Sequence, residues 1–308
     1  MNNLPKIPTD VLLKRLEPPT GSISMVLDTD TYNEVDDQFA VVYALLSAQL
    51  DVEAIYAAPF FNSRSSGPGD GMKKSYEELL RLLGRLNYPH QDFVFRGSSS
   101  YLPAPDQPVK SEAAENLIDR AMQARDKPLY VVAIGAITNV ASAILLEPRI
   151  IENIVVVWLG GHPHYWSNTR EFNLWQDLPA SQLIFNCGVP LVQIPAKNVS
   201  EHLRTTLPEL EKHVKGRGGI GDYLYETFAA YHADHYAWAK EIWDIASIAY
   251  LLNPQWMPSH IVHSPILTSE GTWSFDSSRH FIRVAVDARR NEIFADLFRK
   301  LDKCGLHQ

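Results

Sequence analysis

The chain has 308 residues, 45% of them apolar, so it can bury a large core as one sizeable α/β domain or as two smaller ones. Its 28 Lys and Arg against 36 Asp and Glu give a formal net charge of −8, which speaks against nucleic acid or an anionic membrane as the main partner. Two cysteines are too few for a disulfide framework, and we find neither a secretory signal nor a membrane-length apolar run. We therefore expect a cytoplasmic protein.

Strand-like and helical patterns alternate along most of the chain. An N-terminal arm, residues 1–20, carries a short helical stretch. Strand-like runs follow at 23–27, 52–58, 92–96, 129–134, 154–159, 190–194 and 281–287. Helical patterns lie at 39–46, 72–86, 112–125, 135–143, 179–187, 201–252 and 291–302. This alternation predicts an α/β fold, a mostly parallel central sheet with helices on both faces and extra helices toward the C-terminus. No internal repeat divides the chain, so residues 1–308 are expected to form a single domain.

An acidic stretch follows the first predicted strand. Asp28 and Asp30 end that strand, and Glu34, Asp36 and Asp37 precede the next helix. Carboxylates this close repel one another, and a bound hard cation with several oxygen ligands is the usual compensation. The alternative is an acidic loop with ordinary helix capping. The upstream strand favours a site, because open α/β sheets bind ligands beyond the carboxyl ends of their strands.

Other polar residues follow later strands and belong at the same edge of the sheet. Asn62 follows the second strand, Thr138 the fourth, and Glu171 and Asn173 lie in the loop after the strand at 154–159. Asp244 adjoins an apolar helical run, where a buried carboxylate is costly unless something pairs with it. A cation shared with the acidic stretch would pair with it.

Together these segments resemble the inosine/uridine-preferring nucleoside hydrolase family over about residues 23–250. The matching motifs are Asp28-Thr-Asp30 with Asp36-Asp37, Ile134-Gly-Ala-Ile-Thr-Asn-Val-Ala141, Leu159-Gly-Gly161, Glu171-Phe-Asn173 and Asp244. Each motif is moderately specific, and five in the right order make the resemblance strong. The resemblance implies a Rossmann-like nucleoside hydrolase fold.

The resemblance also implies a metal and a base. In the family a Ca²⁺ ion, which also binds the sugar hydroxyls and the attacking water, is held by carboxylates matching Asp30, Asp37 and Asp244 and by the backbone carbonyl matching Thr138. Asp36 matches the general base.

Further positions are implied in substrate binding. Asn62, Glu171 and Asn173 match residues that hydrogen-bond the sugar, and Asn168 is a weaker candidate for one more such contact. Asp28 is expected to support the metal ligands without binding the ion itself.

Four departures from the family pattern concern the substrate. The loop from Gly161 to Glu171 is shorter than usual, which leaves Asn168 as the candidate for one sugar contact. The turn at 31–35 is two residues longer than usual and lacks Pro-Gly, so Tyr32 or Glu34 could project over the pocket. Lys197 is unusual at its position and could reach a substrate anion or pair with a surface acid. Trp243 replaces the histidine that assists the leaving group in many members, and it is a candidate substrate contact.

Four histidines are further candidates for a role in the site. His232 and His235, expected three apart on a helix, could bind metal, or one of them could donate a proton to the leaving group. His162 and His164 could line the pocket from the loop after the strand at 154–159.

We therefore expect a Ca²⁺-dependent N-glycoside hydrolase that cleaves a nucleoside or related riboside. Two alternatives stay open: a hydrolase acting on another pentoside or carbohydrate, and a catalytically weak homologue that binds sugar and Ca²⁺. The expected partner is a small molecule, with no nucleic acid or membrane. The resemblance implies a homo-oligomer, a dimer or tetramer.

Overall fold

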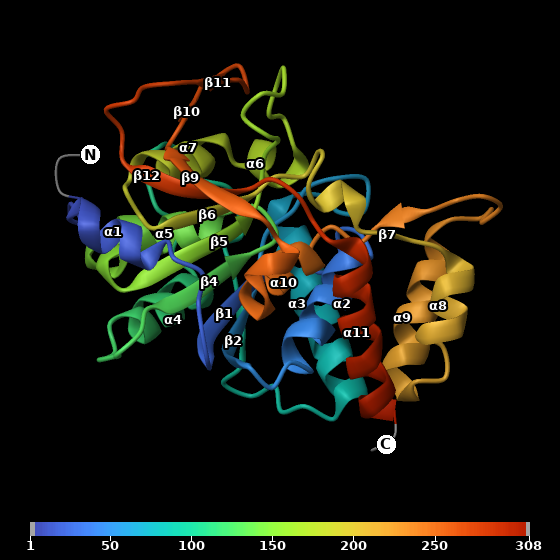
Figure 1. Cartoon of the computed structure of the whole chain (residues 1–308). Coiled ribbons are helices and arrows are strands. Elements are labelled where there is room, and N and C mark those ends of the chain that lie inside the picture. Colours follow the sequence, from blue (N-terminus) through green and yellow to red (C-terminus); the bar gives the residue numbers. More distant parts are fainter. Residues whose placement is uncertain (1–3, 306–308) are drawn as a thin grey trace.

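A computed structural model describes residues 4–305 and contains one eight-stranded sheet (Figure 1). The strand order is β3-β2-β1-β4-β5-β6-β12-β9, and every neighbouring pair is parallel except β12 and β9. Its strands are β1 (Ile23–Thr29), β2 (Leu50–Ala57), β3 (Val94–Arg96), β4 (Leu129–Ala133), β5 (Ile154–Leu159), β6 (Leu191–Ile194), β9 (Ser259–His263) and β12 (Phe281–Ala285). The predicted α/β fold with a mostly parallel sheet is confirmed.

Helices pack on both faces of this sheet. The helices are α1 (Thr9–Arg15), α2 (Asp36–Leu45), α3 (Pro68–Leu86), α4 (Glu112–Ala121), α5 (Thr138–Leu146), α6 (Phe172–Gln176), α7 (Leu178–Asn186), α8 (Leu207–His213), α9 (Gly218–Tyr231), α10 (Ile245–Leu252) and α11 (Arg290–Gly305). Short 3₁₀ turns lie at Pro148–Glu152, Ser200–His202 and Pro254–Trp256. Two small antiparallel pairs, β7 (Arg204–Thr205) with β8 (Lys240–Glu241) and β10 (Ile266–Leu267) with β11 (Trp273–Ser274), complete the elements. Among the described residues, no helix is both long and apolar enough to cross a membrane.

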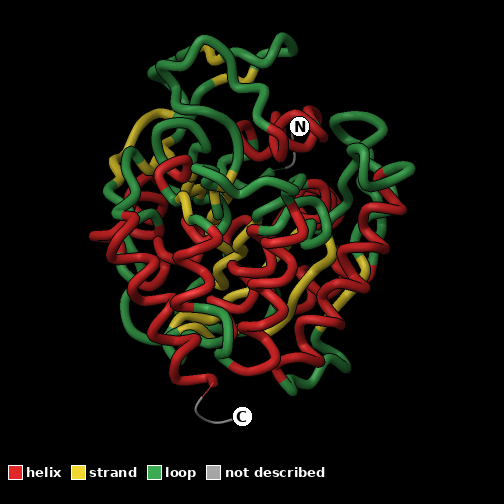
Figure 2. Tube along the Cα trace, turned by 90° about the vertical axis from the view of Figure 1, so that its right-hand side faces the viewer, coloured by secondary structure: helices red, strands yellow, loops and turns green. Residues whose placement is uncertain are grey.

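The core has two layers because the inner strands are apolar on both faces. On β1, Met25 and Leu27 pack toward α2, α3, α10 and α11, whereas Val26 packs toward α4, α5 and α7. Figure 2, seen from the side of α8 and α9, shows helices in front of the strands. Near-continuous apolar strands are typical of parallel sheets covered on both sides. That the whole chain is one domain stays a prediction.

Several predicted boundaries were wrong. Helix α3 begins at Pro68, four residues before the predicted helical pattern at 72–86, since proline is favoured in a first helical turn. Helix α6 (Phe172–Gln176) begins inside the segment predicted as the loop after the strand at 154–159. Helix α9 ends at Tyr231, so His232 and His235 are not on a helix. The antiparallel edge strand β9 was missed because its sequence, Ser-His-Ile-Val-His, is partly exposed and weakly apolar.

The strand order locates the place where a ligand would bind. From β1 the chain steps outward to β2 and β3, and then crosses back to β4 on the other side of β1. Loops that follow β1 and β4 therefore diverge and leave a crevice at the carboxyl ends of these strands. Asp28, on β1, stands beside Ala133 on β4, so the acidic stretch begins at this crevice.

Candidate functional site: a carboxylate-lined cavity

A cavity of about 280 Å³ opens at the carboxyl ends of the central strands. Segments that follow β1, β4, β5 and β6, together with the start of α10, contribute its walls. The residues that line it are Asp30, Asn33, Glu34, Asp36, Asp37, Ile134, Leu159, His162, Arg170, Glu171, Phe172, Asn173, Ala196, Lys197, Trp243 and Asp244. The cavity therefore brings the acidic residues that follow β1 and begin α2 together with residues more than 200 positions later in the chain.

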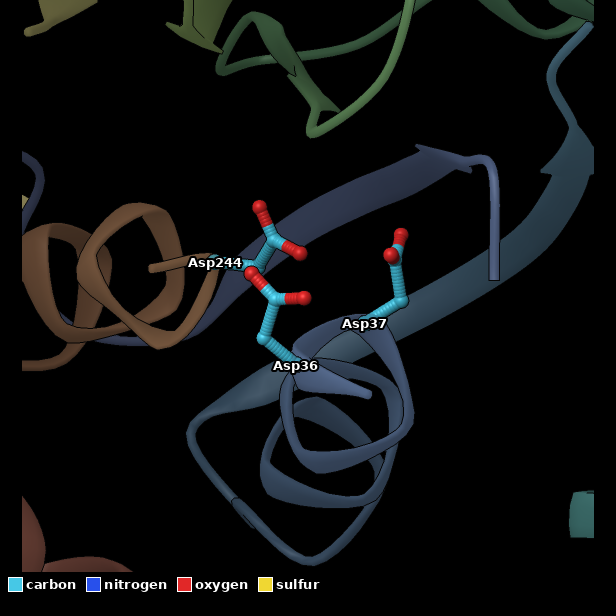
Figure 3. Close-up of side chains that lie close together, drawn as sticks. All are labelled: Asp36, Asp37 and Asp244. Carbon is cyan, nitrogen blue, oxygen red and sulfur yellow. The ribbon is translucent and has the colours of Figure 1, made fainter. Parts of the chain in front are cut away.

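Three aspartates converge on one side of this cavity. Asp36 and Asp37 form the first turn of α2, and Asp244 directly precedes α10, which packs against α2. One carboxylate oxygen of each lies within 4.8 Å of the others, and the three side chains face a common space (Figure 3). Burial and mutual repulsion raise the pKa of Asp37 and Asp244 well above the usual range. Such a cluster could hold a metal ion.

Asp30 completes the acidic wall. It is 1% exposed, and neither of its carboxylate oxygens has a hydrogen-bond partner among residues 4–305. Burial, followed by the charges of Asp37 and Asp36, raises the pKa of Asp30 well above its usual range. A buried carboxylate without partners is unfavourable, and a hard cation with oxygen ligands is the group that compensates it. The donor set therefore fits the metal that the sequence predicts.

Asp28 lies behind this wall and outside the cavity lining. Asn139 donates from its Nδ2 to Asp28 Oδ1 at 2.7 Å, and Asn139 Oδ1 accepts from the Ser98 backbone at 2.7 Å. Burial raises the pKa of Asp28 to about 7, and the Asn139 hydrogen bond opposes this rise. Asn139 thus ties the ends of β1, β3 and α5 together behind the cavity.

Thr138 does not line the cavity with its side chain. Its hydroxyl donates to Asp177 Oδ2 at 2.6 Å, which anchors the start of α5. The turn before it nevertheless touches the acidic wall, because a Cβ on Gly135 would lie only 3.0 Å from Asp30 Cγ. This turn packs directly behind the carboxylate.

Glu171 and Asn173 lie on another wall, as the sequence predicts. The Glu171 carboxylate caps α6 and accepts from the backbone amides of Gly161, Asn173 and Leu174 at 2.9 to 3.1 Å. Burial raises the pKa of Glu171 to about 7, although these hydrogen bonds act to lower it. Asn173 donates from Nδ2 to the carbonyls of Ile134 and Leu159, which fixes the orientation of its amide.

The two other predicted asparagines are placed differently. Asn168 is exposed, lies outside the cavity lining, and accepts from the Arg170 backbone at 3.2 Å. Asn62 also lies outside the lining, and its Nδ2 donates at 2.6 Å to Asn33 Oδ1. Asn33, which sequence reasoning did not select, lines the cavity in its place.

The inserted turn also brings Glu34 into the cavity wall. Glu34 forms an ion pair with Lys240, a lysine only 8% exposed. The Lys240 charge lowers the pKa of nearby Asp36, but burial dominates and raises the Asp36 pKa to about 6. Lys240 escaped sequence analysis because nothing in its local sequence marks it as buried.

The remaining walls combine aromatic and basic groups. Trp243 and Phe172 line the cavity together with Arg170 and Lys197. Lys197 forms an ion pair with Glu201 at 2.8 Å, so of the two predicted partners the structure shows the acidic side chain.

One of the four candidate histidines reaches the cavity. His162 lines it, whereas His164 bonds to Gln193 at 2.8 Å. His232 and His235 bond to backbone carbonyls of their own segment, outside the lining.

Comparison with known proteins identifies the family of the chain. The family model described as inosine-uridine preferring nucleoside hydrolase matches residues 69–302. The chain belongs to this family.

The relatives of this nucleoside hydrolase carry names that refer to different nucleobases. It is 26% identical over 262 residues to a pyrimidine-specific ribonucleoside hydrolase of Klebsiella pneumoniae, covering 76% of this chain and 81% of the relative. It is also 26% identical over 271 residues to a probable uridine nucleosidase of Arabidopsis thaliana, covering 80% of each. A solved purine-preferring ribonucleoside hydrolase from Gardnerella vaginalis has the same fold, with a TM-score of 0.70 at 21% identity over 92% of this chain and 100% of that one.

A solved plant nucleoside hydrolase also shares the fold, with a TM-score of 0.70 at 22% identity over 91% of this chain and 99% of that chain. As a member of this family, the protein is a hydrolase of N-glycosyl compounds. The family model begins after the acidic stretch, so its match is independent of Asp28 to Asp37.

Proposed function

We propose that the protein is a Ca²⁺-dependent hydrolase that cleaves the N-glycosidic bond of a nucleoside or related riboside. The observation that carries this proposal is the buried carboxylate wall at the carboxyl ends of β1 and β4, in which neither carboxylate oxygen of Asp30 has a hydrogen-bond partner among the described residues. Family membership supplies the reaction class, and the cavity supplies groups suited to it.

The carboxylates of Asp30, Asp37 and Asp244, with the backbone carbonyl of Thr138, would hold the ion. These are hard oxygen ligands of the kind Ca²⁺ takes. When bound, the ion would orient the attacking water and lower its pKa.

Asp36 is the proposed general base. It lies in the first turn of α2 beside Asp37, and its carboxylate faces the same space as Asp244. A pKa of about 6 leaves it able both to be charged near neutral pH and to accept a proton from water. The sequence assigned it this role by resemblance, and its position in the cavity supports that role.

Glu171 and Asn173 are proposed to hold the sugar. Cleavage of an N-glycosidic bond passes through a transition state with oxocarbenium character, which carboxylates and bonds to sugar hydroxyls stabilise. The backbone bonds that orient Glu171 and Asn173 keep them in place before substrate binds. Trp243 supplies an aromatic face on which a base or sugar could pack.

The test is turnover with and without metal. Purified protein is incubated with purine, pyrimidine and nicotinamide ribosides, in Ca²⁺ and in chelator, and release of reducing sugar is measured. We expect release from at least one riboside in Ca²⁺ and none in chelator. A protein that releases no sugar from any of them, yet is stabilised by a pentose, would instead be a binder or would act on another carbohydrate.

Asp36→Asn removes the proposed base while keeping the size of the side chain. We expect the rate of sugar release to fall by about 10²- to 10⁴-fold, the usual contribution of a general base. Ca²⁺ should still raise the melting temperature, because Asp30, Asp37 and Asp244 remain.

Asp119→Asn, on the exposed surface of α4, is the matched control and should leave the rate unchanged. An Asp36→Asn protein that hydrolyses at the normal rate would exclude Asp36 as the base.

A further inference from the structure

The turn between β1 and α2, residues 31–35, is held from three sides. Arg64 stacks on Tyr32 with 4.5 Å from its guanidinium carbon to the ring centre. Asn62 donates to Asn33, and Lys240 pairs with Glu34. The turn is therefore a fixed part of the cavity wall.

The hydrogen bonds around Asn62 determine how Asn33 is oriented. Asn62 Oδ1 accepts from the Arg64 backbone N–H at 2.8 Å, and a backbone N–H can only donate. Asn62 Nδ2 must therefore face Asn33, where it donates to Asn33 Oδ1 at 2.6 Å. The Asn33 Nδ2 group is left as a donor, and no described residue accepts from it.

Asn33 is otherwise well enclosed. It is 8% exposed, its backbone N–H donates to the Asp30 carbonyl at 2.7 Å, and it lines the cavity next to Asp36 and Asp37. An amide donor at a cavity wall that has no protein acceptor is available to a ligand that enters the cavity. On this acidic side of the cavity, a neutral acceptor such as a sugar hydroxyl oxygen is the group that suits an amide N–H.

We propose that Asn33 donates a hydrogen bond to a sugar hydroxyl of the substrate, and that Asn62 is a positioning residue that acts through it. This inference rests on the proposed function for the identity of the sugar. The predicted sugar contact is thereby assigned to Asn33, in the inserted turn, instead of Asn62.

The experiment is a double-mutant cycle on Asn33→Ala and Asn62→Ala. Asn33→Ala should lower kcat/KM by about 10- to 100-fold, and Asn62→Ala should lower it by less, because Asn33 can still reach the sugar when its support is lost. The double variant should match Asn33→Ala alone. If instead the two losses multiply, Asn62 contacts the substrate itself and the proposal is wrong. An unchanged kcat/KM for Asn33→Ala overturns it equally.

A binding measurement separates this inference from the proposed hydrolase. Asn33→Ala and the parent protein are titrated with D-ribose in Ca²⁺, and the rise in melting temperature is recorded. We expect the parent to show a rise that Asn33→Ala loses, whether or not the parent hydrolyses any riboside. A full rise in Asn33→Ala, or none in the parent, overturns the contact.

Asn253→Ala serves as the control for loss of a local turn. Asn253 Oδ1 accepts from the backbone N–H two residues on, as Asn62 Oδ1 does, but it follows the last residue of α10 and does not line the cavity. It should leave kcat/KM and the response to ribose unchanged.

Discussion

Lys240 and Glu34 place opposite charges beside the proposed base. Both affect the pKa of Asp36, Lys240 by lowering it and Glu34 by raising it. Lys240 is held among Tyr231 and Trp243, with its Nζ less than 6 Å from each ring centre. A lysine so enclosed keeps its charge only because carboxylates surround it.

Replacing Lys240 by methionine should therefore raise the pKa of Asp36. We expect the acidic limb of the pH profile of kcat/KM to move to higher pH in Lys240→Met, because the positive charge that favours the carboxylate is gone. Glu34→Gln should move it the opposite way. Lys240→Arg keeps the charge and should move it least, and an unmoved limb in both charge variants would show that the pair does not act on the base.

At the scale of elements, the β4–α5 turn packs against Asp30, one of the proposed metal ligands. Gly135 lets this turn approach Asp30, and a Cβ there would also meet the Ala58 side chain at 3.2 Å. Thr138 and Asn139, three and four residues after Gly135, then anchor α5 to Asp177 and Asp28. One turn thus connects the two halves of the sheet at the cavity.

Gly135→Ala should displace the Asp30 carboxylate. We expect the affinity for Ca²⁺ to fall by about tenfold, the lower end of the effect of residues that orient metal ligands. Calorimetric titration with Ca²⁺ measures it. Gly84→Ala is the control, since a Cβ at Gly84 on α3 meets no atom within 4 Å and should leave Ca²⁺ affinity unchanged.

At the scale of the whole molecule, the carboxylate wall should make stability depend on pH and metal together. Asp28 has a pKa of about 7 and Asp36 of about 6, both above the ordinary value of 3.8. The metal-free folded protein then binds more protons than the unfolded chain between about pH 4 and 7. Its stability should be fully present at the acidic end of this window and fall as the pH rises through 6 to 7.

Calcium should reverse this trend. If it binds the charged carboxylates of the folded state as proposed, it adds about 2.7 kcal/mol to the free energy of unfolding at a concentration of 100 times Kd. We expect the rise in melting temperature on adding Ca²⁺ to be larger at pH 7 than at pH 5. Asp244→Asn should lose most of the rise at both pH values, and an equal rise at both in the parent would mean that these carboxylates are not the ligands.

The predicted homo-oligomer also belongs to this scale and stays a prediction. Light scattering on the purified protein gives its mass in solution directly.

Much of the fold follows from local patterns. The strand at 154–159 is apolar throughout, so its bounds could be read from sequence alone, and β5 has those bounds. The acidic stretch could be placed at the carboxyl ends of the strands, because it directly follows an apolar strand-like run. Edge elements such as β9 are determined by pairing with a strand some 20 residues later, which no local pattern reports.

Short motifs next to strand ends were enough to predict the family and the carboxylates that meet in the cavity, and apolar patterns were enough to predict the central alternation of strands and helices. Contacts between distant segments were needed to show that Asn33 lines the cavity while Asn62 lies outside its lining, and that Lys240 lies buried beside the acidic turn. Such contacts join residues 29 and 206 positions apart, and side-chain packing selects them. The inserted turn at 31–35 marked a departure in sequence, and its role depends on what folds against it.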